Sequence, residues 1–90
     1  MVSIKREHFE EKRLLVQKTN ALIGAVAKVL SLGSSEIDPA DSFFSIGGDS
    51  LAALMVTEEL ADIGFQLKLA DLLNNDSLSR VALGMREATR

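Results

Sequence analysis

The sequence predicts an all-α protein, a small four-helix bundle with a long first loop and a short third helix. Apolar residues recur at helical spacing in stretches separated by Gly, Asn and the single proline, and no segment shows a convincing strand period. Hydrophobic residues make up 47% of the chain but only four residues are aromatic, all Phe, which favours an aliphatic helical core over a β-sandwich. The 90 residues suffice for one small domain, which would bury roughly 60% of its unfolded surface.

The first helix is predicted from two adjoining segments. Residues 1–14 are dense in charge and form either an extension of the helix or a separate N-terminal leader, so the domain proper is expected at 15–90. From Leu15 the pattern becomes amphipathic, and Gly33 marks the latest end of the helix. Its apolar stripe consists of Leu15, Leu22, Val26, Val29 and Leu30.

The long first loop is predicted between Gly33 and Gly48, where Ser, Gly, Asp and the only proline concentrate. Four large apolar residues are embedded in it, namely Ile37, Phe43, Phe44 and Ile46. They indicate a loop that folds back over the bundle, and both phenylalanines are predicted to anchor it in the core.

The second helix is predicted from Leu51 to Ile63, because this stretch lacks Gly and Pro and is rich in good helix formers. Gly64 provides its C-terminal stop. At its start, either Asp49 or Ser50 can cap the helix with a side-chain oxygen.

The faces of this helix predict a docking surface. At about 100° per residue an apolar group falls on one side, namely Ala53, Val56, Leu60 and Ile63. The opposite side carries Glu58, Glu59 and Asp62, together with Leu51 and Met55. We interpret Leu51, Met55, Glu58 and Glu59 as a partner-binding surface with an apolar centre and a charged rim. The alternative is that Leu51 packs against the loop and Met55 is incidental.

The third and fourth helices follow a short connection. A helical turn is predicted around Ala70 to Leu73, and the polar run from Asn74 to Ser77 then interrupts the chain. Either Asp76 or Ser77 can cap a final helix that is predicted to run to about Ala88.

Composition and charge restrict the environment and the partners. The chain has no Cys, which excludes disulfides and thiolate metal sites, and we expect no metal centre. No run approaches the roughly 20 apolar residues that span a membrane, so we expect a cytoplasmic monomer with no membrane partner. Residues 34–76 carry nine acidic groups against Lys68 alone, a net charge of −8, so nucleic acid is not expected to bind there. A basic protein surface is a plausible partner, and a merely solvated acidic face is the alternative.

Ser50 is the residue best placed to bear an anion. It lies where a glycine-containing loop meets a helix N-terminus, whose unpaired N–H groups favour a phosphate ester. Gly48-Asp49-Ser50-Leu51 also spells the tetrapeptide of the GDSL esterases, but a serine nucleophile needs a base. The only histidine, His8, lies far upstream in a charged segment, so no catalytic residue is predicted.

The loop reads Phe-Phe-Ser-Ile-Gly-Gly-Asp-Ser-Leu from Phe43 to Leu51 and resembles the thiolation, or peptidyl carrier protein, domains of nonribosomal peptide synthetases. The resemblance extends from about Leu15 to Ala88, including the segment from Phe65 to Leu73. It implies a covalent 4′-phosphopantetheine arm on Ser50, taken from coenzyme A by a phosphopantetheinyl transferase with Mg²⁺. It also implies an orienting role for Asp49, beside that residue's possible role as the helix cap.

The resemblance further implies a carrier that acts as a substrate shuttle and not as an enzyme. The arm would hold an aminoacyl, peptidyl or acyl group as a thioester for nonribosomal peptide or hybrid polyketide synthesis. An adenylation or acyltransferase enzyme would load it, and condensation, ketosynthase or tailoring enzymes would receive the cargo. Two alternatives stay open: an acyl carrier protein of polyketide or fatty-acid synthesis, and a non-carrier helical interaction module.

Some positions depart from the family pattern, and others favour one kind of carrier over another. The apolar Met55 stands where fatty-acid carriers typically have an acid, which argues against a fatty-acid synthase partner. The family often has Pro at the positions of Lys68 and Asp76 and Phe at that of Leu73, so the shape of the short third helix is less defined. Met1 and the charged leader favour a free-standing carrier over a domain excised from a synthetase.

Overall fold

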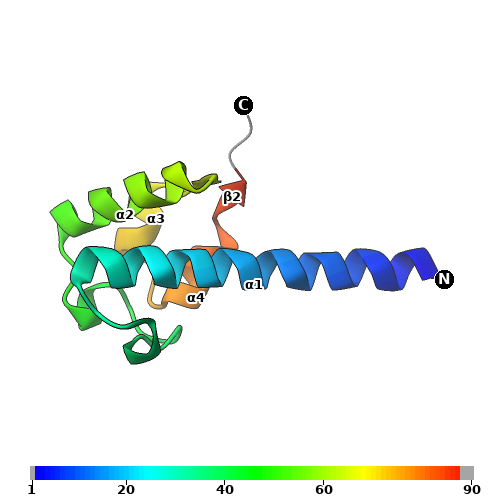
Figure 1. Cartoon of the computed structure of the whole chain (residues 1–90), viewed down its shortest axis with the longest axis horizontal. Helices are drawn as coiled ribbons and strands as arrows, with labels where there is room; N and C mark the ends of the chain where they lie inside the picture. The colour runs from blue at the N-terminus through cyan, green and yellow to red at the C-terminus, as the bar shows by residue number, and fades with distance from the viewer. Residues whose placement is uncertain (1, 88–90) are drawn as a thin grey trace.

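A computed structural model of the chain describes residues 2–87, with side chains from Lys12 onward. The described part contains four α-helices and a pair of very short strands, which confirms the predicted small helical bundle (Figure 1). The helices are α1 (Val2–Leu30), α2 (Ser50–Asp62), α3 (Leu69–Asn74) and α4 (Leu78–Leu83). The strands are β1 (Phe65–Gln66) and β2 (Arg86–Glu87), which pair antiparallel.

Helix α1 is the longest element, and the bundle packs against its C-terminal half. Figure 1 shows α2 and α4 beside this half, while the N-terminal half projects beyond the other elements. The charge-dense residues before Leu15 are thus helical in backbone from Val2 and continue α1 without a break. Most of the tertiary structure therefore depends on the half of α1 that follows Leu15.

The core is aliphatic, as the composition predicts. Its buried residues come from all four helices, from the long loop and from the segment after α4. The fully buried large side chains are Phe43, Leu22, Leu60, Leu72, Leu78, Met85, Val26, Val56 and Val81. No buried polar side-chain atom among the described residues lacks a hydrogen-bond partner, so this core carries no desolvation penalty of that kind.

The long loop is tied to the start of α4. The first backbone N–H groups of a helix have no partner within that helix. Here the N–H of Leu78 donates to the carbonyl of Asp41 at 2.8 Å, and the N–H of Ser79 donates to that of Pro39 at 2.9 Å. The loop from Gly33 to Gly48 therefore folds back over the bundle, as predicted.

Three apolar side chains are exposed, two from the apolar sides of predicted helices and one predicted to anchor the loop in the core. Leu15 lies where α1 leaves the bundle, so little packs against it, and Ile63 follows the last turn of α2 beside Gly64. Phe44 is also exposed, because of the two neighbouring rings only that of Phe43 points into the core. The predicted core anchoring is thus correct for Phe43 and wrong for Phe44.

The C-terminal segment also differs from the prediction. Helix α4 ends at Leu83, because the chain turns at Gly84 and Met85 enters the core; the predicted end at Ala88 lies outside the described residues. Ser77, one of the two predicted caps, accepts a hydrogen bond from the N–H of Arg80. The strands β1 and β2 were not predicted, because two residues are too few to show an alternating pattern.

In the part of the chain that the structure describes, no helix has the length and apolarity that crossing a membrane requires.

Candidate functional site

The loop before α2 rests on the ring of Phe43. The backbone N–H of Gly48 donates to the carbonyl of Phe43 at 3.0 Å, and the Phe43 ring lies directly against Gly48. A methyl group on Gly48 would lie 2.5 Å from the Cδ2 and Cζ atoms of that ring, far inside van der Waals contact. Gly47 adopts φ +100°, a left-handed conformation that glycine accommodates most easily. Both glycines are therefore structural requirements of the turn that leads to Ser50.

Asp49 is the N-cap of α2, which settles the alternative left open by the sequence. Its backbone is extended (φ −136°, ψ −177°), and its Oδ1 accepts a hydrogen bond from the N–H of Ala52 at 2.8 Å. Its carbonyl also accepts the N–H of Ala53 at 2.8 Å. Ser50 is consequently the first residue of the helix and is not its cap.

The hydroxyl of Ser50 is exposed and uncommitted. Ser50 belongs to the exposed class, and no described group forms a hydrogen bond with its side chain, whereas the nearby Ser42 and Ser45 are bonded to each other. Because the capping role falls to Asp49, esterification of Ser50 would break no contact of the fold. A phosphate ester there would also meet the positive end of the α2 dipole, worth about 0.3–1 kcal/mol at an exposed terminus. The site therefore fits a phosphate-linked group.

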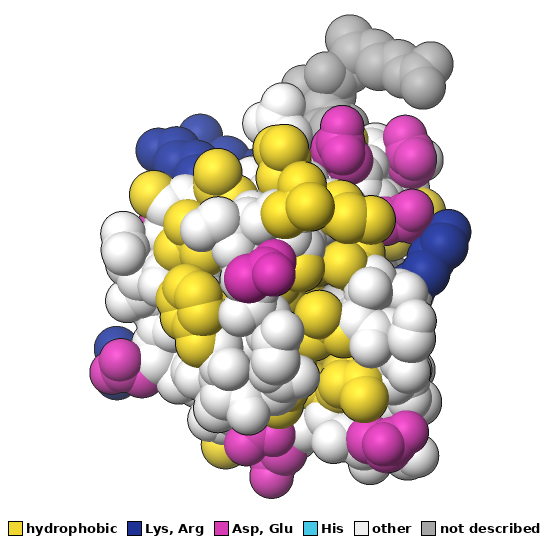
Figure 2. Space-filling view, turned by 90° about the vertical axis from the view of Figure 1, so that its left-hand side faces the viewer, with side chains coloured by type: hydrophobic (Ala, Val, Ile, Leu, Met, Phe, Trp, Pro, Cys, Tyr) yellow, Lys and Arg dark blue, Asp and Glu magenta, His cyan; other side chains and the backbone are white. Residues whose placement is uncertain are grey.

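An exposed apolar surface surrounds Ser50. Leu51 is 69% exposed and Met55 is 45% exposed, which excludes the alternative that Leu51 packs against the loop. Leu54 and Phe44 are exposed as well. Figure 2 views the end of the molecule where α1 ends and α2 begins, and hydrophobic side chains gather there with acidic side chains between and around them.

The two glutamates assigned to this surface have different environments. Glu58 is exposed. Glu59 is one-third exposed and its Oε2 lies 3.0 Å from Nζ of Lys28, so it joins α2 to the C-terminal end of α1. This ion pair is partly open to solvent and contributes at most about 1 kcal/mol. Glu58 is thus the more available of the two carboxylates.

Sequence reasoning missed two members of the exposed apolar group, Leu54 and Phe44. A signal for Leu54 was present, because Leu51, Leu54 and Met55 stand at positions i, i+3 and i+4 of one helix face. Phe44 gave no comparable signal, since periodicity does not apply in a loop. The two phenylalanine rings pack edge to face with centroids 6.2 Å apart, so Phe44 is held against its buried neighbour.

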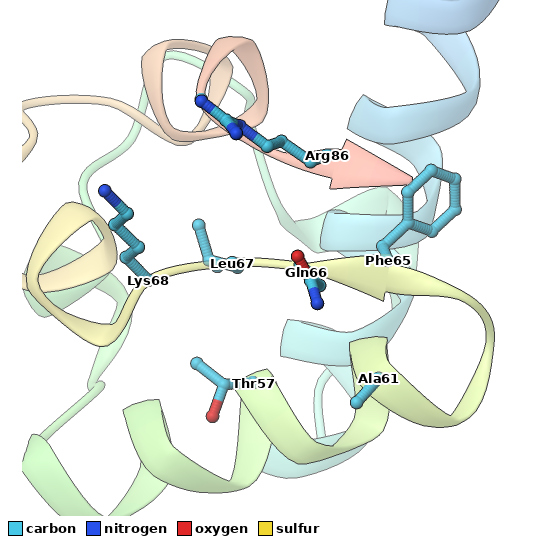
Figure 3. A pocket seen from close by; sticks show the side chains of 8 residues that line it. Thr57, Ala61, Phe65, Gln66, Leu67, Lys68 and Arg86 are labelled. Atoms are coloured by element: carbon cyan, nitrogen blue, oxygen red, sulfur yellow. The ribbon is translucent and has the colours of Figure 1, made fainter. Parts of the chain in front are cut away.

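A pocket of about 360 Å³ lies farther along α2, between that helix and the strands. Figure 3 shows Thr57 and Ala61 of α2 on one side, and Lys68 and Arg86 directed to the same side of the segment that follows β1. Thr57 is two helical turns from Ser50, a distance of roughly 10 Å along the axis. Lys68, the sole basic residue of segment 34–76, therefore lies with Arg86 in the lining of this pocket.

The fold and the site together define a small helical domain that presents a free serine hydroxyl at a helix N-terminus. The family model described as "Phosphopantetheine attachment site" matches residues 20–83, well over half of the chain. The chain belongs to this family. The match confirms the resemblance drawn from the loop sequence, and with it 4′-phosphopantetheine as the cofactor.

Relatives agree with this membership. The chain is 39% identical over 66 residues to Nonribosomal peptide synthetase rstn8 of Penicillium ochrochloron, covering 72% of this chain and 3% of the relative. It is 39% identical over 77 residues to Nonribosomal peptide synthetase 7 of Aspergillus fumigatus, covering 84% of this chain and 3% of that protein. The chain thus spans only a few per cent of the curated relatives it matches.

Two solved structures share the fold. A structure titled "Non Ribosomal PCP domain" superimposes with a TM-score of 0.72 at 22% identity, over 79% of this chain and 90% of that chain. A second, titled "The crystal structure of holo T3CT", gives a TM-score of 0.69 at 28% identity, over 72% of this chain and 93% of that chain. These likenesses confirm the predicted carrier-domain fold.

Proposed function

We propose that Ser50 carries the 4′-phosphopantetheine arm and that the chain delivers aminoacyl, peptidyl or acyl groups within nonribosomal peptide synthesis. The observation that carries the proposal is the Ser50 hydroxyl itself, exposed at the first position of α2 and free because Asp49 caps the helix. When bound, the arm supplies a thiol on which cargo is held as a thioester.

Attachment requires chemistry that the chain does not contribute. The Ser50 Oγ–P bond forms as the pyrophosphate linkage of coenzyme A breaks, adenosine 3′,5′-bisphosphate leaves, and the serine proton passes to a base of the transferase. Within this chain, His8 lies on α1, 22 residues before the helix ends at Leu30, which corresponds to about 33 Å along the helix. That separation from the start of α2 supports a carrier function over a serine esterase.

The surface around Ser50 is suited to transient docking. Leu51, Leu54 and Met55 form an exposed apolar centre, and Glu58 provides exposed negative charge at the rim. We expect the phosphopantetheinyl transferase, a loading adenylation or acyltransferase enzyme and a receiving condensation, ketosynthase or tailoring enzyme to contact this surface in turn. A small interface of this kind releases its partner readily, as a shuttle between enzymes requires.

The relatives favour a peptidyl carrier over an acyl carrier of fatty-acid synthesis. Both named relatives are nonribosomal peptide synthetases, and Met55 places an apolar side chain where an acid would suit fatty-acid carriers. Because the chain covers so little of those relatives, the cargo and the order of partners belong to the proposal.

Intact mass analysis tests the attachment. After incubation with coenzyme A, Mg²⁺ and a broadly acting phosphopantetheinyl transferase, wild-type protein should gain one phosphopantetheine and Ser50→Ala none. Ser45→Ala is the matched control, since Ser45 is an exposed serine of the same loop whose hydroxyl donates to the carbonyl of Ser42. It should be modified fully. Modification of Ser50→Ala, or no modification of the wild type, would refute the assignment.

A further inference from the structure

The pocket between α2 and the strands lies in line with Ser50. Residues seven or eleven positions apart on an α-helix differ by only about 20° around its axis. Thr57 and Ala61, which form the α2 side of the pocket, follow Ser50 at these two intervals. One face of α2 therefore leads from Ser50 into the pocket, over about 10 Å to Thr57 and about 16 Å to Ala61.

The other side of this pocket carries two cations from distant segments of the chain. Strand pairing places Arg86 opposite Gln66, and Lys68 stands two residues after Gln66. The side chains of Lys68 and Arg86 both line the pocket. Figure 3 shows them toward the end of the pocket at which Thr57 lies, which is the end nearer to Ser50.

The two cations have no anionic partner among the described residues. None of the described residues that line the pocket is acidic. Asp71 lies beside Gly84 at its edge, yet the ion pair in the described part of the chain joins Lys28 to Glu59, and neither pocket cation takes part in it. Both pocket cations are exposed to solvent. A carboxylate that enters the pocket would therefore form charge-assisted contacts without displacing an ion pair of the described residues.

The arm proposed for Ser50 is long enough to bring cargo into this pocket. From the serine oxygen to the thiol sulfur, phosphopantetheine has about as many backbone bonds as five amino-acid residues, so its extended length is about 16 Å. The sulfur therefore reaches the level of Thr57 with slack, and the group that it holds lies beyond. Because a short flexible tether gives an effective concentration in the millimolar range, even weak ion pairing would hold the cargo there.

We propose that this pocket binds a free carboxylate of the cargo, so that the chain carries an acyl or aminoacyl group ending in a carboxylate. A dicarboxylic acid linked through one end is the simplest example, since the thioester uses one carboxyl group and the second remains charged. The inference rests on the proposed function, because it requires the arm on Ser50. A cargo whose only charge is an ammonium group is repelled by Lys68 and Arg86 and stays outside. Lys68 stands where the family often has Pro, so the site is a feature of this chain.

NMR of the acylated protein tests the pocket. A broadly acting phosphopantetheinyl transferase would load glutaryl-coenzyme A or, separately, its 4-carbamoylbutanoyl analogue, in which a neutral amide replaces the carboxylate. The backbone amide signals of Thr57, Lys68 and Arg86 should shift with the glutaryl group and much less with the analogue. The pKa of the glutaryl carboxyl, followed with a carbon-13 label, should lie roughly 0.5 below that of free glutaryl pantetheine, because nearby cations favour the charged form.

Variants that remove single charges identify the cations. Lys68→Gln and Arg86→Gln should each reduce the pKa difference by about half, and the double variant should abolish it. Lys12→Gln is the matched control, since Lys12 lines a different hollow on the projecting half of α1, and it should keep the full difference. Equal shifts with the two cargoes, or equal effects of Lys12→Gln and Lys68→Gln, would overturn the proposal. Pocket signals that respond to a partner enzyme but to neither cargo would instead assign the cations to an acidic segment of that partner.

Failure of the arm assignment gives a different result. Mass analysis before NMR shows whether the acylphosphopantetheine group has been added, and its absence would refute the role of Ser50 without testing the pocket. The unmodified protein is then titrated with S-glutaryl-N-acetylcysteamine and with its neutral amide analogue. The glutaryl compound should shift the amide signals of Lys68 and Arg86 in the millimolar range, and the analogue should not. The same response to both compounds, or to neither, would overturn the pocket as a carboxylate site.

Discussion

Substituting Gly48 by alanine tests whether the turn before Ser50 depends on its contact with Phe43. The new methyl group would lie 2.5 Å from the Cδ2 and Cζ atoms of the ring, whereas carbon atoms in contact prefer about 3.5–4.0 Å. The ring or the loop must therefore move by roughly 1 Å. Phe43 is only 1% exposed and has no free space to enter, so the strain falls on the packed core.

Overpacking of this kind costs about 1–3 kcal/mol, and we expect the upper part of that range because three ring atoms are affected. In a domain of this size, about 2–3 kcal/mol lowers the melting temperature by roughly 10–20 °C. Urea denaturation followed by circular dichroism measures the change. Gly24→Ala is the matched control: Gly24 is an exposed residue inside α1, a methyl group there meets nothing within 4 Å, and the substitution should stabilise by about 0.5–1 kcal/mol.

A double mutant separates the ring contact from other effects of Gly48. In Phe43→Leu the ring is gone, so adding Gly48→Ala should cost at least about 1 kcal/mol less than it does in the wild type. A loss below about 0.5 kcal/mol for Gly48→Ala, or strictly additive effects in the double mutant, would refute the reasoning.

Three further predictions concern single positions near the ends of α1 and α2. Ser31→Gly should raise the free energy of unfolding, measured by urea denaturation, by about 0.5–1 kcal/mol. Ser31 has a left-handed φ of 58°, a conformation that is higher in energy for other residues than for glycine. An unchanged denaturation midpoint would contradict this. Asp49→Ala should lower the melting temperature, by the equivalent of about 1 kcal/mol, through loss of the cap bond to Ala52, while Asp49→Asn should retain most of the stability. Leu51→Ala should change the free energy of unfolding by less than about 0.5 kcal/mol, because the side chain is 69% exposed. It should nevertheless weaken binding of the loading enzyme about tenfold, as measured by calorimetry. Unchanged binding would remove Leu51 from the docking surface.

Sequence reasoning succeeded where a local rule determines the structure. The turn glycines, the capping oxygens and the polar break before α4 act through neighbouring residues, so Asp49, Ser77 and α3 could be placed within a residue or two. To predict that the Ser50 hydroxyl is free, one must also know that Asp49 is the cap. The sequence left the cap open between Asp49 and Ser50.

The failures share a different cause, which is that burial depends on distant elements. Phe43 and Phe44 are chemically identical neighbours, and only the path of the loop over the bundle decides which ring enters the core. Ile63 continues the apolar side of α2 in sequence, but it stands after the last residue of the helix and its side chain is left exposed. In the same way, β2 follows the buried Met85 and pairs with β1, an arrangement between distant segments that no pattern of two residues can indicate.

The charges around Ser50 act over two distances, one within the turn itself and one across the surrounding surface. In the proposed modified form, a phosphodiester adds negative charge to a segment whose net charge is already −8. The N-terminus of α2 offsets this locally, and the Asp49 carboxylate, the nearest acid in sequence, is turned toward the N–H of Ala52. The remaining acids act over about a Debye length, roughly 8 Å at physiological salt, where they attract the cations of an approaching partner. Neutralising Glu58 should therefore change the affinity for a partner but not the electrostatic cost of the phosphate on Ser50. That cost depends instead on the N-terminus of α2.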